Sequence, residues 1–102
     1  MIVDAAFIAE TLDANGLVID IERAHKTLKA VLAPLNYRNL DDVPDLKITN
    51  TTTEFLSKHI FDQLAEAARA GLLGRDAREL KAIRVTILES HVARAWYEAP
   101  LW

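Results

Sequence analysis

The sequence predicts an α+β fold in which an antiparallel sheet carries two helices on one face. Three observations lead to this prediction. Extended apolar segments lie near both ends of the chain, two segments with helical apolar spacing lie between them, and glycine or proline separates the elements. Strands at the ends and helices in the middle are typical of a layered α+β domain. The free edges of so small a sheet favour pairing with other subunits.

The N-terminal segment predicts a strand over Met1–Leu12, although its alanines keep a helix open as an alternative. Asp13–Gly16 contains the Asn-Gly dipeptide, which is a strong turn signal. Leu17–Ile19 then resumes an extended apolar run. We therefore expect residues 1–19 to fold back on themselves as a short ribbon.

The first helix is predicted to follow Asp20, whose side chain suits the N-cap position. Pro34 should end or kink this helix, because proline lacks an N–H donor and clashes with the preceding turn. The expected apolar stripe consists of Ile21, Ala24, Leu28, Val31, Leu32 and Leu35.

The second helix is predicted to open within Asn50–Glu54, where Thr51 and Glu54 fit a capping box. A capping box needs no ligand, so this segment is explained by helix formation alone. Gly71 is the expected C-terminal stop. The expected apolar stripe consists of Phe55, Leu56, Ile60, Leu64, Ala67 and Ala68.

The C-terminal part predicts a hairpin. Ile83, Val85 and Ile87 alternate with polar residues, as in a half-buried strand, and Val92–Tyr97 is the expected returning strand. Glu89 continues the phase of the apolar residues, which would point its carboxylate toward the packed side. Two interpretations stay open: a strand-end carboxylate that reaches solvent, or a carboxylate that binds N–H donors of a ligand.

Bulk composition limits the classes of function. The 102 residues suffice for one domain, and 51% hydrophobic with 26% charged residues fits a soluble globular protein. A net charge of −3 gives no basic surface for nucleic acid, and the absence of cysteine excludes disulfides and thiolate chemistry. No apolar run is long enough to cross a membrane, and we expect a cytoplasmic protein.

Three separate stretches resemble one family. GLVIDIERAHKTLKAVLAPLNYRNLDD is similar to G-M-V-x-D-F…L-D-H-[RK]-x-L-[ND], ITNTTTEFLSKHIFDQL to N-P-T-x-E-N, and IRVTILES…ARAWY to V-x-V-x-E-T…A-x-Y. These patterns belong to the 6-pyruvoyl-tetrahydropterin synthase and 6-carboxytetrahydropterin synthase group. Their order and spacing agree over roughly Leu12 to Leu101. The resemblance thus covers most of the chain.

The resemblance implies the tunnelling fold, in which sheets assemble into a ring or barrel. The implied assembly is a homohexamer built as a dimer of trimers, or a trimer, with active sites between subunits. The implied substrate is 7,8-dihydroneopterin triphosphate. The family glutamate that anchors the pterin ring falls on Glu89, and the helix-start motif falls on Thr52 and Glu54, with Thr53 beside them. A carboxylate suits this task because it accepts two parallel N–H bonds.

The chain departs from the family pattern on the catalytic side. The family zinc ligands and catalytic cysteine would precede this chain, so zinc is expected only if an upstream segment exists. Residues 1–102 are expected to form one domain that lacks the family's first strand. The family's Asp-His pair becomes Asn36-Tyr37, which is poorly suited to base catalysis at neutral pH. His91 lies two residues from Glu89 and is a candidate for proton transfer with Tyr37, or else a solvated turn residue.

His25 and His59 are expected to be helix-surface or boundary residues, because no histidines stand at metal-binding spacing. Three hypotheses follow for the function. The chain is a lyase of the pterin synthase type, a metal-free module that binds a pterin or purine, or a structural oligomer without a ligand. The sequence alone leaves all three open.

Overall fold

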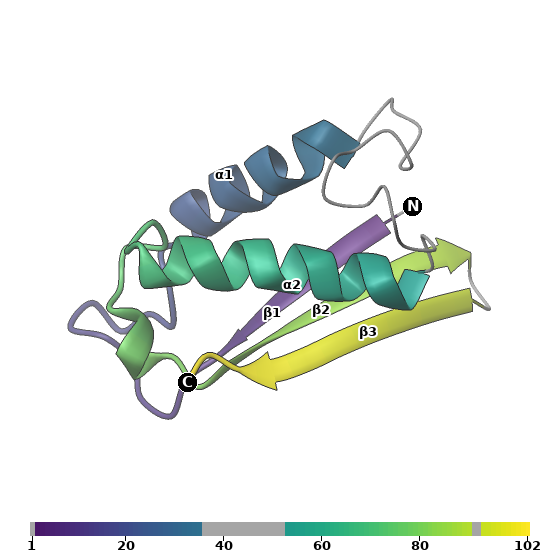
Figure 1. Ribbon diagram of the computed structural model, residues 1–102. Coiled ribbons are helices and arrows are strands. Elements are labelled where there is room, and N and C mark those ends of the chain that lie inside the picture. Colours follow the sequence, from purple (N-terminus) through teal and green to yellow (C-terminus); the bar gives the residue numbers. More distant parts are fainter. Residues whose placement is uncertain (1, 36–52, 91–92) are drawn as a thin grey trace.

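The computed structural model describes residues 2–35, 53–90 and 93–102. Within these residues, three antiparallel strands form a sheet in the order β1-β2-β3, and both α-helices lie on one of its faces (Figure 1). The α+β prediction is confirmed. The elements are β1 (Ile2–Ile8), α1 (Ile21–Leu32), the 3-10 turn η1 (Ala33–Leu35), α2 (Thr53–Arg69), the 3-10 turn η4 (Ala77–Glu79), β2 (Ala82–Ser90) and β3 (Ala93–Pro100).

The core lies between α2 and the central strand β2. Ile83, Val85 and Ile87 of β2 are completely buried, as their alternation predicts. α2 covers them with a face that includes Ile60 and Leu64, which are also completely buried. Burial of each such side chain contributes roughly 1.5–3 kcal/mol, so this layer dominates the stability of the fold.

Helix α1 begins and ends where its capping residues predict. Asp20 is the N-cap, and its Oδ1 accepts a hydrogen bond from the Arg23 amide at 3.1 Å. The helix ends at Leu32, and Pro34 stands in the 3-10 turn that follows. The prediction that Ile21 belongs to the buried stripe is wrong, since Ile21 is 72% exposed. Packing begins one turn later, at the buried Ala24.

A strand is predicted over Met1–Leu12, and the structure has a shorter one, β1, over Ile2–Ile8; the predicted ribbon over residues 1–19 is wrong. β1 pairs with β2, and Leu17–Ile19 forms no strand. The turn itself is present: Gly16 has φ +76° and its amide donates to the carbonyl of Asp13 at 3.0 Å. The chain after the turn does not return to β1, because the carbonyls of Leu17 and Val18 accept hydrogen bonds from a buried arginine instead.

Helix α2 ends in a Schellman motif at the predicted glycine. Gly71 has φ +81°, and its amide donates to the Ala68 carbonyl while the Leu72 amide donates to the Ala67 carbonyl, both at 3.0 Å. At the other end, α2 begins at Thr53, and the capping-box residue Thr51 lies outside the described residues.

The closing hairpin of β2 and β3 is confirmed, and β3 continues to Pro100, beyond the predicted end at Tyr97. Its predicted first residue, Val92, lies outside the described residues. No helix in the described part of the chain is both long and apolar enough to span a membrane.

Candidate functional site

Glu89 lies at a register irregularity near the end of β2. Leu88 pairs with Arg94 and Ser90 pairs with Ala93, so β2 advances by two residues while β3 advances by one. Glu89 is therefore the additional residue of a β-bulge, a feature that redirects a side chain and often occurs beside binding sites. In the single chain Glu89 is exposed. Its carboxylate is accessible to a ligand or to a neighbouring copy.

The start of α2 lies at the same end of the molecule as the end of β2 (Figure 1). Thr53 is half-buried and Glu54 is exposed in the first turn of this helix. The first amides of a helix have no intrahelical acceptor and carry partial positive charge, so they suit a carbonyl or anionic group. This end of the molecule thus combines an acceptor carboxylate with the partial positive charge of a helix start.

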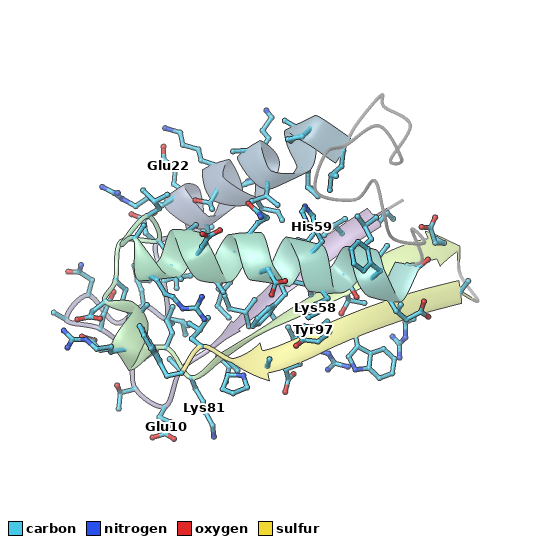
Figure 2. The ribbon with its side chains drawn as sticks, in the orientation of Figure 1. Glu10, Glu22, Lys58, His59, Lys81 and Tyr97 are labelled. Carbon is cyan, nitrogen blue, oxygen red and sulfur yellow. The ribbon has the colours of Figure 1, made fainter. Side chains whose placement is uncertain are left out.

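Aromatic packing holds α2 against β3 close to this end. The ring centroids of Phe61 and Tyr97 lie 5.0 Å apart in an edge-to-face arrangement. Lys58 of α2 lies over the Tyr97 ring at 5.8 Å, with both residues visible in Figure 2. The hydrogen bond from Lys58 to Asp62, 2.8 Å long, raises the pKa of the Lys58 amine. These contacts orient the first turns of α2 relative to the hairpin.

Four of the predicted site residues lie outside the described residues: Asn36, Tyr37, Thr52 and His91. The roles assigned to them by the family resemblance stay predictions. The end of β2, which carries Glu89, and the start of α2, which carries Thr53 and Glu54, lie at the same end of the molecule (Figure 1). These three are the predicted substrate-binding residues that the structure describes.

No group of three His, Cys, Asp or Glu side chains that could hold a metal ion occurs within residues 2–35, 53–90 and 93–102. His25 is exposed on α1, and His59 is half-buried on α2. Both positions agree with the interpretation of these histidines as surface or boundary residues. The described part of the chain therefore does not fit the zinc site of the family.

Sequence reasoning missed an open groove of about 1130 Å³ between α1 and α2. Its lining includes the apolar Val31 and Ala67 and the polar Glu22 and His59, the last two labelled in Figure 2. Apolar periodicity predicts that each helix has a packing face. It does not predict the distance between two helices, so no local signal reveals such a groove.

Sequence reasoning also missed Arg75, whose side chain is 2% exposed. Its guanidinium donates to the carbonyls of Thr11 at 2.8 Å and Val18 at 2.9 Å. It also lies 3.3 Å from the Glu79 carboxylate. This arginine ties the loop after β1 to the connection after α2, at the end of the molecule opposite the start of α2.

The same loop contains a carboxylate with a perturbed pKa. Asp13 Oδ1 accepts hydrogen bonds from the amides of Leu17 at 2.9 Å and Asn15 at 2.8 Å. The bond from the Leu17 amide is the largest cause that lowers the pKa of Asp13. The Asp13 carboxylate stabilises its own turn, and it is distant in sequence from Glu89.

Comparison with known proteins now adds to this geometry. A family model described as 6-pyruvoyl tetrahydropterin synthase matches residues 1–100. The chain belongs to the 6-pyruvoyl tetrahydropterin synthase family. No curated protein matches the chain. The family assignment agrees with the antiparallel sheet and its two helices, and it supports a pterin-related function.

Proposed function

We propose that this protein binds a pterin, such as 7,8-dihydroneopterin triphosphate, with the Glu89 carboxylate as the anchor of the ring. The carboxylate accepts two N–H bonds from the amino-pyrimidine edge. A single charge-assisted bond of this kind contributes about 1.5–3 kcal/mol, so this pair carries a large share of the affinity.

The position of Glu89 is the observation that carries the proposal. The residue lies near the end of β2, whose inward side chains Ile83, Val85 and Ile87 are completely buried, yet its own side chain is exposed. The start of α2, which carries Thr53 and Glu54, lies at the same end of the molecule (Figure 1). In the proposed complex, the partial positive charge of this helix start faces the ring's carbonyl oxygen. Membership of the family provides the chemical class of the ligand.

In the proposed assembly the ligand lies between subunits, and the chain forms a trimer or a hexamer of two trimers. A single copy offers Glu89 to solvent. A neighbouring copy would exclude water from the pair, and hydrogen bonds to a charged group strengthen when the surrounding dielectric falls. Affinity for the pterin is therefore expected to depend on self-association.

For the described residues we propose binding of the pterin and no catalytic step. Lyase chemistry in this family needs a zinc site, and the described residues do not fit one. Zinc would then be held by residues outside the described part of the chain. Metal analysis of the purified protein, together with a turnover assay on 7,8-dihydroneopterin triphosphate, distinguishes a lyase from a binding module. Turnover by this chain would establish the lyase.

The test of the proposal is a calorimetric titration of the protein with neopterin, compared with the variant Glu89→Gln. The variant retains the shape of the side chain and removes its charge. We expect Glu89→Gln to weaken binding by about 2–3 kcal/mol, which is a loss of roughly 30- to 150-fold.

Glu10→Gln is the matched control. Glu10 is an exposed carboxylate that pairs with Lys81 at 3.8 Å, at the opposite end of the molecule from the α2 start (Figure 2). Its loss should leave the affinity unchanged. If neither the original protein nor the control binds neopterin, the chain is a structural oligomer and the proposal is wrong. If Glu89→Gln binds neopterin equally well, Glu89 is not the anchor of the ring and the proposed site is wrong.

A further inference from the structure

The groove between α1 and α2 shares none of its described residues with the proposed pterin site. It is lined by α1, the turn η1, α2 and the connection after α2, whereas Glu89 belongs to β2. Its volume of about 1130 Å³ slightly exceeds the range of about 300–1,000 Å³ that is usual for small-molecule sites. The groove therefore has room for a molecule larger than a single amino acid.

Much of the lining of this groove is apolar. Val31 of α1 and Ala67 of α2 are half-buried, and Leu35 of η1 is buried. Ala30 and Ala70 are exposed along the same groove. A ligand with aliphatic side chains would remove this surface from water, and burial of apolar surface favours binding.

Lys26 of α1 and Glu66 of α2 place opposite charges on the two walls of the groove. The amide of Asp20, just before α1, donates to the carbonyl of Leu73, just after α2, at 3.3 Å, so the two helices run antiparallel (Figure 1). Lys26 comes six residues after Asp20, and Glu66 comes seven residues before Leu73. The two charges therefore lie at similar heights along the groove.

Neither Lys26 nor Glu66 forms an ion pair with any residue that the structure describes. The cation nearer the start of α1, Arg23, already pairs with Asp20 at 3.7 Å. Glu22 lines that same end of the groove. Further along, the walls thus offer a ligand one cation and one anion, both without a partner in the described part of the chain.

Two uncharged polar side chains of α2 also line the groove. His59 and Gln63 are half-buried, and neither forms a side-chain hydrogen bond within the part of α2 that the structure describes. His59 lies on the side of α2 that faces α1 (Figure 2). The carboxamide of Gln63 has both donors and an acceptor, so it matches the N–H and the carbonyl of a peptide group.

We propose that this groove binds a short apolar peptide with free ends, such as leucyl-leucine. The ligand's carboxylate pairs with Lys26 and its ammonium group with Glu66, while its peptide group hydrogen-bonds to Gln63. Its aliphatic side chains cover Val31 and Ala67. An internal segment of a longer protein has neither end group, so the two opposite charges favour a small zwitterion. The site does not depend on pterin binding.

The first experiment is a calorimetric titration of the intact chain with three related peptides. Leucyl-leucine has both end charges, N-acetyl-leucyl-leucine lacks the ammonium group, and leucyl-leucine amide lacks the carboxylate. We expect the free dipeptide to bind most tightly. Each blocked peptide should bind about fivefold more weakly, because the groove is open to water and each ion pair is partly screened.

Two variants assign each end of the ligand to its wall. Lys26→Gln should weaken the binding of leucyl-leucine about fivefold and leave the binding of leucyl-leucine amide unchanged, because the amide has no carboxylate to lose. Glu66→Gln should likewise weaken the free dipeptide and spare the acetylated one. Both side chains are exposed, so neither change should disturb the fold.

Lys29→Gln is the matched control. Lys29 is exposed on α1, one turn after Lys26, and it does not line the groove. Its loss should leave all three affinities unchanged. Absence of dipeptide binding, equal binding of the three peptides, or an equal effect of Lys26→Gln on all of them would overturn the proposal. Equally tight binding of the doubly blocked N-acetyl-leucyl-leucine amide would also overturn it and leave the groove to an internal segment of another protein.

Discussion

The buried guanidinium of Arg75 is the residue-scale feature with the largest expected effect on stability. It donates to the carbonyls of Thr11, Leu17 and Val18, and these oxygens lie in a loop without regular secondary structure. Replacing Arg75 by methionine would leave them without this donor. We expect Arg75→Met to lower the free energy of unfolding by about 3 kcal/mol in urea titrations.

The neighbouring Arg78 provides the control for that variant. Its side chain is 79% exposed and pairs with Asp76 at 3.0 Å. Arg78→Met should leave the urea midpoint nearly unchanged, because exposed ion pairs contribute little. Similar losses for the two variants would show that Arg75 does not organise the loop.

The carboxylates of Asp13 and Asp76 predict how stability depends on pH. Hydrogen bonds lower the pKa of both, from the Leu17 amide for Asp13 and from the Arg78 side chain for Asp76. A folded-state pKa below the unfolded value of 3.8 stabilises the fold above that pH. This stabilisation is lost as the pH falls through the folded-state pKa.

We therefore expect the free energy of unfolding to decline slightly below about pH 4, since both carboxylates are exposed and water screens their interactions. The double variant Asp13→Asn, Asp76→Asn should lose less stability over the same range. Denaturant titrations between neutral pH and pH 3 measure the difference. An acid decline of the same size in both proteins would contradict this assignment.

Residue patterns predict well which strand side chains point inward or outward. They do not predict the exposure of Glu89 or the contacts of Arg75. The alternation of Ile83, Val85 and Ile87 correctly predicts their burial. Glu89 shares their parity, yet it is exposed, because the bulge shifts the register at that residue. Arg75 bonds to residues more than 50 positions away, so no local pattern could reveal it.

At the scale of elements, the connection between α2 and η4 depends on two glycines with positive φ. Gly71 has φ +81° and open space where a Cβ would stand. Gly74 has φ +78°, but its Cβ would lie 3.1 Å from the Cβ of Asp20 and from the Cδ of Arg23. Asp20 caps α1, so Gly74 marks a close approach of two elements.

We expect Gly71→Ala to cost about 1–2 kcal/mol for the left-handed backbone alone. Gly74→Ala should cost more, since the N-cap of α1 must also move. Chemical denaturation of the two variants measures this order. Equal costs would show that α1 does not pack closely against this turn.

The helices were predictable because their signals are local. Asp20, Pro34 and Gly71 each act within one turn of a helix end, and all three positions are confirmed. Strand pairing is different, since it joins segments distant in sequence. The Asn-Gly turn suggested a local partner for β1, but the partner is β2, more than 70 residues away. The ribbon prediction failed for this reason.

At the scale of the whole molecule, the two ends of the sheet differ in structure. One end holds Arg75 and the buried contacts of the loops, and the other holds Glu89 and the start of α2. The layer is complete over β2 and incomplete over β1, where side chains are half-buried. The composition predicts how much apolar surface the chain has. Only the packing of the helices against the sheet shows which part of that surface stays uncovered.

A crystal structure of the assembled protein with neopterin is the most direct test of the central claim. We expect the pterin ring to lie between two copies, with both carboxylate oxygens of Glu89 within about 3 Å of the ring and amino nitrogens of its amino-pyrimidine edge. Glu89 exposed to bulk solvent in the assembly, with the pterin bound elsewhere or absent, would contradict the account.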